Sequence, residues 1–110
     1  MTDQQTVIAG QKNLAAGAKD MFRALVAFDQ TVLGTDTALP KKYKELMAVA
    51  VALTTQCPGC LSQHTAAAIA AGASQAELAE TVHVAAALRA GAAMYHGMAY
   101  VMPHAAGDHS

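Results

Sequence analysis

Apolar residues recur along this chain at intervals of three and four, which is the spacing of one face of an α-helix. No stretch alternates between apolar and polar residues as a half-buried strand does, so the pattern predicts helices throughout. The predicted helices cover five segments: about Thr6 to Thr31 with an interruption near Gly17, Pro40 to Thr55, Pro58 to Gly72, about Gln75 to Leu88, and about Ala90 to Val101.

Local signals mark where several of these helices begin and end. Pro40 suits the first position of a helix, where its missing amide hydrogen costs nothing. Gly72 is typical of a C-terminal cap. Ser74 and Glu77 form the spacing of a capping box, which predicts a helix start. Pro103 is expected to end the last helix, and residues 104–110 are expected to form a frayed tail.

The composition supports an all-α fold that needs a partner subunit. The 110 residues include 27 alanines and only five aromatic residues, a profile that favours helix by intrinsic propensity. Such small side chains leave each helix little bulk to bury. We therefore expect one domain over residues 1–110, a small multi-helix bundle that completes its core by oligomerisation.

Charge and hydropathy exclude some classes of partner. Seven basic residues face eight acidic ones, and the only basic cluster is Lys41, Lys42 and Lys44, so nucleic acid is not an expected partner. The N-terminus lacks the pattern of a secretory signal, and the apolar run from Leu46 to Leu53 is too short to span a bilayer. We expect a cytoplasmic protein with no membrane partner.

The chain contains two cysteines, in the motif Cys57-Pro58-Gly59-Cys60. A disulfide between them would close a loop too small to stabilise the fold much. In a reducing compartment such a pair is typical of redox-active or metal-binding sites.

His64 lies in phase with the two cysteines. At 100° per residue, Cys57, Cys60 and His64 project within an arc of about 60° on a helix. Cys57 stands at the positive end of the helix, where a thiol pKa falls below its usual 8.5 or so. His64, one turn beyond Cys60, can take or relay the Cys60 proton.

Glu45 is a candidate third member of this site. If the second predicted helix turns back on the third, Glu45 lies about 15 Å before the turn and His64 about 10 Å after it, which makes the two nearly level. A carboxylate there would orient the imidazole, directly or through a water. The simpler alternative is that Glu45 pairs with Lys41 or Lys42.

Zinc binding by two thiolates and an imidazole is the competing hypothesis. The chain has no second Cys-x-x-Cys motif to support it, and Leu61 stands where covalent haem attachment needs a histidine, so we expect no cofactor and no metal. A fourth zinc ligand would have to come from His83, His96 or Glu45. For His83 two interpretations stay open: a histidine in the core, or a group at an interface. A methionine every fourth residue near the C-terminus is more typical of a packing or subunit-facing stripe than of a ligand site.

Residues 39–91 resemble the carboxymuconolactone decarboxylase and alkylhydroperoxidase D-like superfamily. The resemblance rests on Leu39-Pro40-Lys41 leading to Glu45-Leu46, on the Cys57, Cys60 and His64 spacing, and on Ala71-Gly72-Ala73-Ser74 before the helix start at Glu77 to Glu80. It implies an all-helical fold and a trimer or hexamer.

For the peroxidase branch, the resemblance implies a thiol-dependent reduction of hydroperoxides. Cys60 would attack the peroxide, His64 and Glu45 would relay its proton, and Cys57 would resolve the sulfenic acid to a redox-active disulfide. A dithiol reductant such as a lipoyl or thioredoxin-like protein would regenerate the thiols. The chain departs from better-characterised peroxidases at Gly59, where they carry a histidine. The alternatives are lactone decarboxylation, which does not use the cysteine pair, and a non-catalytic zinc-binding or redox-sensing module.

Overall fold

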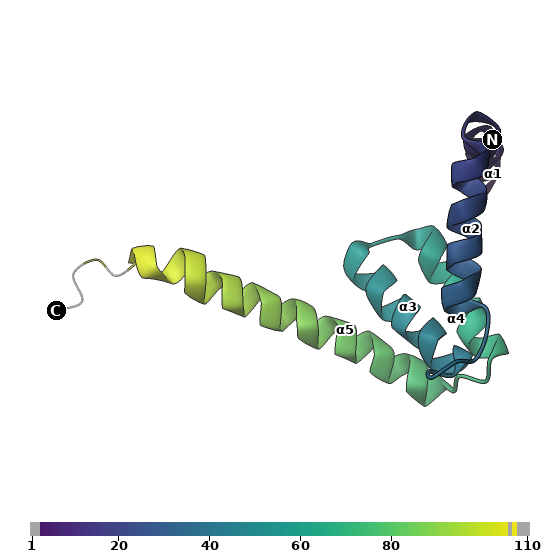
Figure 1. Cartoon of the computed structure of the whole chain (residues 1–110). Helices are drawn as coiled ribbons and strands as arrows, with labels where there is room; N and C mark the ends of the chain where they lie inside the picture. Colours follow the sequence, from purple (N-terminus) through teal and green to yellow (C-terminus); the bar gives the residue numbers. More distant parts are fainter. Residues whose placement is uncertain (1–2, 106, 108–110) are drawn as a thin grey trace. The chain divides into compact units, whose positions relative to one another are not determined.

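The computed structural model describes residues 3–105 and 107, and these residues form helices and turns without a strand (Figure 1). The all-α prediction is confirmed. The elements are α1 (Asp3–Gly17), α2 (Lys19–Leu33), α3 (Lys41–Thr55), α4 (Pro58–Ala70), α5 (Gln75–His96), the π-helix η1 (Gly97–Val101) and the 3₁₀-helix η2 (Met102–Ala105). None of the helices built by the described residues combines the length and hydropathy that a bilayer crossing requires.

The chain separates into two compact units, residues 1–38 and 39–110. In the first unit α1 and α2 pack against each other, and they are separated at Ala18, next to the interruption predicted near Gly17. Ala18 has φ −143° and ψ 65°, outside the helical region, and it is the N-cap of α2. The boundary between the units coincides with Leu39, the first residue of the motif region identified in the sequence.

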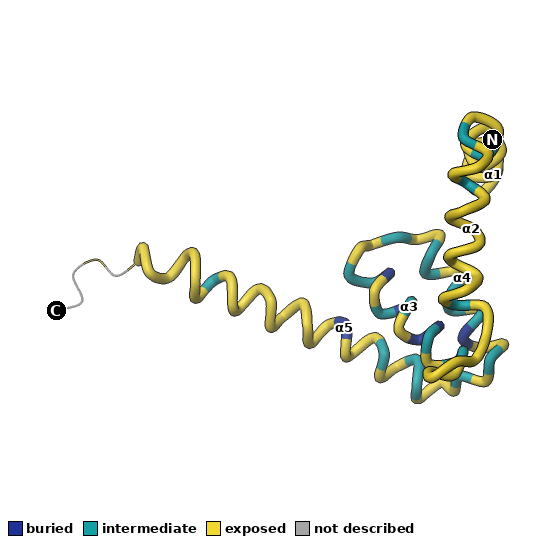
Figure 2. Tube along the Cα trace, in the orientation of Figure 1, coloured by how far each residue is buried: buried dark blue, intermediate teal, exposed yellow. Residues whose placement is uncertain are grey.

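In the second unit α3 is the central helix, since it packs against both α4 and α5. Four of its residues, Glu45, Leu46, Val49 and Ala52, are buried, and they lie in the dark segments of α3 in Figure 2. The apolar run from Leu46 to Leu53 predicts a helix covered on all sides, but Met47 and Val51 are 51% and 60% exposed. The buried apolar residues of the described chain are few and mostly small: Leu46, Val49, Ala52, Ala68 and Ala85.

The start of α5 is fixed by the capping box that the sequence predicts. The Ser74 side chain accepts from the Glu77 amide at 3.1 Å, and Glu77 accepts from the Ser74 amide at 2.9 Å. Glu77 also pairs with Lys42 of α3 at 3.0 Å. The Ser74 amide and then Lys42 lower the pKa of Glu77, and Glu77 raises the pKa of Lys42. This network ties the first turn of α5 to the first turn of α3.

Three helix boundaries differ from the sequence expectation. The two helices predicted from Gln75 to Leu88 and from Ala90 to Val101 are one helix that runs to His96 and continues as a π-helix. A lone glycine, Gly91, weakens a helix but does not end it unless the backbone turns left-handed there. Pro40 is the cap before α3 instead of its first residue, and Pro103 lies inside η2.

The predicted tail begins at His104, which belongs to η2 together with Ala105. Residues 106 and 108–110 lie outside the described part of the chain.

The capping box predicts a measurable stability loss for Ser74→Ala. The substitution leaves the Glu77 amide without its acceptor, so we expect the free energy of unfolding to fall by about 1 kcal/mol in urea titrations at pH 7. Ser62→Ala, on the exposed surface of α4, is the matched control and should change stability little. Equal stabilities for the two variants would contradict a capping role.

Candidate redox site at the junction of two helices

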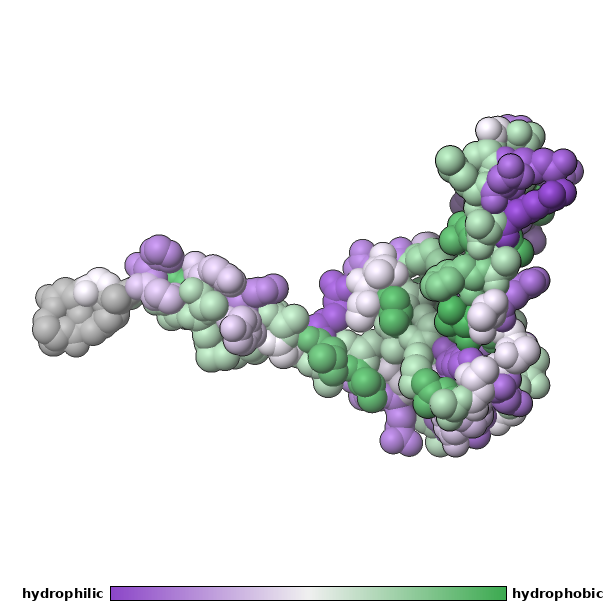
Figure 3. All heavy atoms as spheres, in the orientation of Figure 1, coloured by the Kyte–Doolittle hydropathy of each residue, from purple (hydrophilic) through white to green (hydrophobic). Residues whose placement is uncertain are grey.

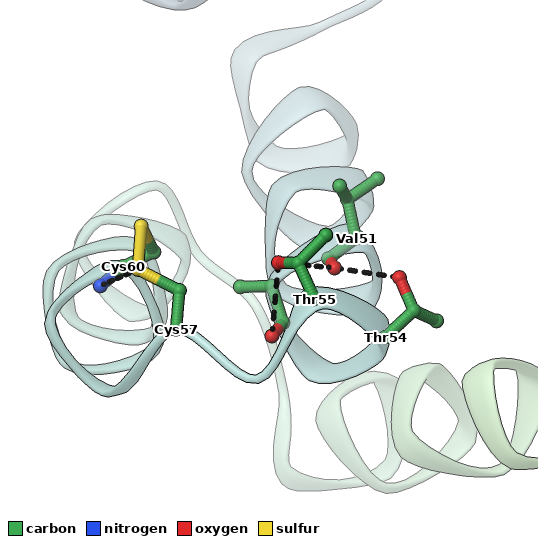
Figure 4. The surroundings of a disulfide bond; sticks show 6 residues. Val51, Thr54, Thr55, Cys57 and Cys60 are labelled. Carbon is green, nitrogen blue, oxygen red and sulfur yellow. Dashed lines mark hydrogen bonds between the residues drawn. A yellow bond between two sulfur atoms is a disulfide. The ribbon is translucent and has the colours of Figure 1, made fainter.

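The chain reverses between α3 and α4 through a single left-handed residue. Gln56 has φ 56° and ψ 52°, and the Cys57 amide then donates to the Ala52 carbonyl at 3.1 Å. This bond spans six residues, as in the Schellman motif that commonly ends helices. Gln56 is the only described residue other than glycine with a positive φ. Two threonines in the last turn of α3, Thr54 and Thr55, bond back to the Val51 carbonyl (Figure 4).

Because the turn is so short, Cys57 follows α3 directly and caps α4. Its sulfur accepts from the Cys60 amide at 3.3 Å, and Pro58 occupies the first helical position, where no amide donor is needed. The two cysteines form a disulfide with their Cα atoms 5.3 Å apart (Figure 4). Both are partly exposed. The pair therefore lies at the amide-rich end of α4, where a thiolate is stabilised.

Glu45 of α3 and His64 of α4 lie in contact. Nδ1 of His64 is 2.7 Å from Oε2 of Glu45, and the glutamate is only 4% exposed. An ionised carboxylate accepts hydrogen bonds and cannot donate them, so in the neutral ring the proton sits on Nδ1 and Nε2 is left as the acceptor. Glu45 thus fixes both the tautomer and the orientation of the imidazole.

The simpler pairing of Glu45 with a lysine is not what the structure shows. Lys42 bonds to Glu77, and the partner of Glu45 is His64. No hydrogen bond joins His64 to a cysteine within the described residues. The structure therefore brings together the candidate residues in two pairs: Cys57 with Cys60 at the start of α4, and His64, one turn further along α4, with Glu45 of α3.

The other histidines considered as ligands lie on α5. His83 is exposed and its Nδ1 contacts the Ala79 carbonyl at 2.8 Å, so the core-histidine interpretation is wrong. His96 packs its ring edge against Tyr95 and lies beside Tyr100. Within residues 3–105 and 107, no three of the histidine, cysteine, aspartate and glutamate side chains are grouped as metal ligands would be.

Arg89 is a structural contributor that the sequence analysis did not identify. Its Nη1 donates to the Thr54 carbonyl at 2.6 Å, so α5 holds the last turn of α3 just before the cysteine motif. The contact joins residues 35 positions apart, and no local pattern signals it.

The chain also matches the model of a known protein family. The model of the carboxymuconolactone decarboxylase family covers residues 19–102, which is most of the chain. The protein belongs to this family.

The chain is also similar to a curated protein and to a solved structure. An uncharacterized protein 4 in the cox locus of Paracoccus denitrificans is 44% identical over 81 residues, which are 74% of this chain and 69% of that protein. The crystal structure of an apo carboxymuconolactone decarboxylase family protein from Legionella pneumophila superposes with a TM-score of 0.69 at 28% identity, over 76% of this chain and 74% of that one.

The left-handed turn predicts that Gln56→Gly stabilises the protein. Glycine adopts positive φ without the steric cost that a side chain meets, so we expect a gain of about 0.5 to 1 kcal/mol in the free energy of unfolding. Gly72→Ala, at φ 100°, is the opposite test and should destabilise. A loss of stability in Gln56→Gly would show that the turn does not have this conformation in solution.

Proposed function

We propose that the protein is a thiol-dependent peroxidase or disulfide oxidoreductase that reduces hydroperoxides with Cys57 and Cys60. The observation that carries the proposal is the cysteine pair at the amino end of α4, with His64 one turn further along the same helix and in contact with the buried carboxylate of Glu45 from α3. Membership of a family that includes enzymes supports a catalytic role.

The reaction begins at Cys60, the cysteine one turn before His64. The Cys60 thiolate attacks the terminal oxygen of the hydroperoxide, the oxygen–oxygen bond breaks, and the alkoxide leaves as an alcohol after taking a proton. Cys60 is then a sulfenic acid. The Cys57 sulfur attacks it, water leaves, and the disulfide forms. The peroxide is reduced by two electrons and the two thiols are oxidised by two.

Glu45 and His64 supply the proton relay. Nε2 of His64 takes the Cys60 proton, through a water where the two groups are not in direct contact, and the resulting imidazolium is stabilised by the carboxylate that holds Nδ1. The same proton is then available for the leaving alkoxide. Glu45 is buried and in contact with the imidazole of His64, so it is well suited to this role.

Turnover requires a two-electron reductant that can reach the disulfide. We propose a dithiol, of the lipoyl or thioredoxin-like class, acting on a homo-oligomer of three or six copies in the cytoplasm. Gly59 leaves the outer side of the motif without a side chain, and a Cβ at that position would meet nothing within 4 Å. The surface beside the disulfide is therefore open to an approaching thiol.

Peroxide consumption by single cysteine variants tests the proposal. Reduced wild-type protein should consume an organic hydroperoxide with loss of two thiols per peroxide. Cys60→Ser should abolish the reaction, whereas Cys57→Ser should react once and stop as a sulfenic acid. If wild type and Cys60→Ser consume peroxide equally slowly, the peroxidase assignment fails. A lactone decarboxylase would keep its activity in the double variant.

The relay predicts a change in the pH dependence of thiol reactivity. His64→Ala should raise the apparent thiol pKa measured by alkylation rates and slow peroxide reduction by roughly 100-fold, within the range for a general base. Glu45→Gln should shift that thiol pKa in the same direction by less. His83→Ala, which removes an exposed histidine from α5, is the control and should behave as wild type. Unchanged pH profiles in the first two variants would remove the relay.

A further inference from the structure

Two helix ends with opposite partial charges meet at the cysteine motif. The turn at Gln56 places the carboxyl end of α3 next to the amino end of α4. A helix carries roughly half a negative charge at its carboxyl end and roughly half a positive charge at its amino end. The end of α3 therefore opposes the stabilisation that the end of α4 offers to a thiolate at Cys57. A cation at the end of α3 would remove this opposition.

Arg89 of α5 supplies such a cation. Its Nη1 donates to the Thr54 carbonyl at 2.6 Å, and Thr54 lies in the last turn of α3, just before Cys57. Since neighbouring Cα atoms are about 3.8 Å apart, the Cα atoms of Thr54 and Cys57 are separated by at most about 11 Å. The last turn of α3 has no basic residue of its own, and the first turn of α4 has no acidic residue to offset the charge.

The packing of α5 on α3 holds Arg89 in place. Ala85 lies one turn before Arg89, on the same face of α5, and is 4% exposed. The first turn of α5 is fixed by its capping box and by the pair of Glu77 with Lys42. The contact of Arg89 with Thr54 is the attachment of α5 at the cysteine end of α3.

Formal charges are scarce around the cysteine motif, which gives a single cation more influence there. Residues 46–76 contain no Asp, Glu, Lys or Arg, and residues 81–105 contain one, Arg89. Figure 3 shows apolar surface along the part of α5 next to α3. On α4 the ionisable group besides the cysteine is His64, and its Nδ1 is held by Glu45.

The other ionisable side chains of α3 and α5 lie at the far end of α3 or elsewhere on α5. The first turn of α3 and the first two turns of α5 contain Lys41, Lys42, Tyr43, Lys44, Glu77 and Glu80. Along α3, Lys42 is about 18 Å from Thr54, which exceeds the Debye length of about 10 Å in 0.1 M salt. On α5, His83 contacts the Ala79 carbonyl, and His96 lies beside Tyr95 and Tyr100.

We propose that Arg89 is a positioning residue of the redox site, which fixes the last turn of α3 and, through its positive charge, favours the thiolate form of Cys57. The inference rests on the thiol chemistry proposed above. The thiolate of Cys57 is the form that attacks the Cys60 sulfenic acid. A thiol that ionises readily is also the better leaving group when the disulfide is reduced.

The reduction shows where this charge acts. A thiolate of the dithiol reductant bonds to the Cys60 sulfur, the bond between Cys60 and Cys57 breaks, and its electron pair leaves on Cys57 as a thiolate. The second thiol of the reductant then displaces Cys60, so the reductant becomes a disulfide and both cysteines are reduced. Arg89 stabilises the charge that appears on Cys57 in the first of these steps.

The pH dependence of Cys57 alkylation tests the proposal without any peroxide. The variant Cys60→Ser leaves Cys57 as the one thiol of the chain, and iodoacetamide reacts with its thiolate. In this background Arg89→Gln keeps an N–H donor but loses the charge, and it should raise the Cys57 thiol pKa by about half a unit at low salt. Arg89→Lys keeps the charge and should shift that pKa by less than half as much. Lys42→Gln, which removes a cation from the other end of α3, is the control and should leave the Cys57 pKa unchanged.

The salt dependence separates the charge from the hydrogen bond. The difference in Cys57 pKa between Cys60→Ser alone and with Arg89→Gln should disappear in 1 M NaCl, where the Debye length is about 3 Å. A difference that persists, an unchanged pKa in Arg89→Gln, or an equally large shift in Arg89→Lys would overturn the proposal. Circular dichroism checks that the variants stay helical. If Arg89→Gln does not fold, Cys60→Ser alone decides, because its Cys57 pKa should rise with salt and a constant value contradicts the role of Arg89.

The equilibrium with glutathione distinguishes this inference from the peroxidase assignment. Two glutathione thiols give two electrons to the disulfide between Cys57 and Cys60 and become glutathione disulfide. At pH values above the thiol pKa, Arg89→Gln should lower the equilibrium constant for this reduction by roughly threefold, which corresponds to half a pKa unit, and the difference should shrink at lower pH. Equal constants in wild type and Arg89→Gln at every pH would overturn the inference. A threefold difference in a protein that consumes no peroxide would remove the proposed function and leave the effect of Arg89 in place.

Discussion

The reversal of the chain at Gln56 is the constraint on which the candidate site depends. A single left-handed residue ends α3, and Cys57 both completes the cap of α3 through its amide and begins the cap of α4 through its sulfur. Cys57 is thus shared by the end of one helix and the start of the next. The same tight reversal sets α4 back along α3, which brings His64 level with Glu45. The position of the redox pair and the contact between carboxylate and imidazole therefore have one structural cause.

The packing around this turn relies on small side chains. Ala52, Ala68 and Ala85 are buried where helices meet, so the helices approach closely but bury little apolar area. Polar contacts supplement the core at both ends of α3, through Lys42 with Glu77 at the first turn and Arg89 with the Thr54 carbonyl at the last. In the described structure these contacts hold α3 between its neighbours, and α3 carries both Glu45 and the turn into Cys57.

Most of the fold and the pairing within the site follow from local sequence rules, and the exceptions have physical reasons. Helix geometry fixes the in-phase spacing of Cys57, Cys60 and His64. Once the chain turns back after α3, the rise per residue places Glu45 at the same height along the paired helices as His64. Gln56 could not be identified as left-handed, because glutamine has no preference for that region and only the shortness of the connection imposes it. The continuity of α5 through Gly91 and the Arg89 contact depend on tertiary context that no local pattern contains.

The apolar run in α3 shows how one helix can serve both the site and the proposed assembly. Glu45, Val49 and Ala52 are buried on the side that faces α4, so this side positions the carboxylate. Tyr43 and Met47 lie on another side, where they line a hollow of about 260 Å³ between α3 and α5. A helix that is apolar all round but half exposed in the single chain is accounted for if a second copy covers the hollow.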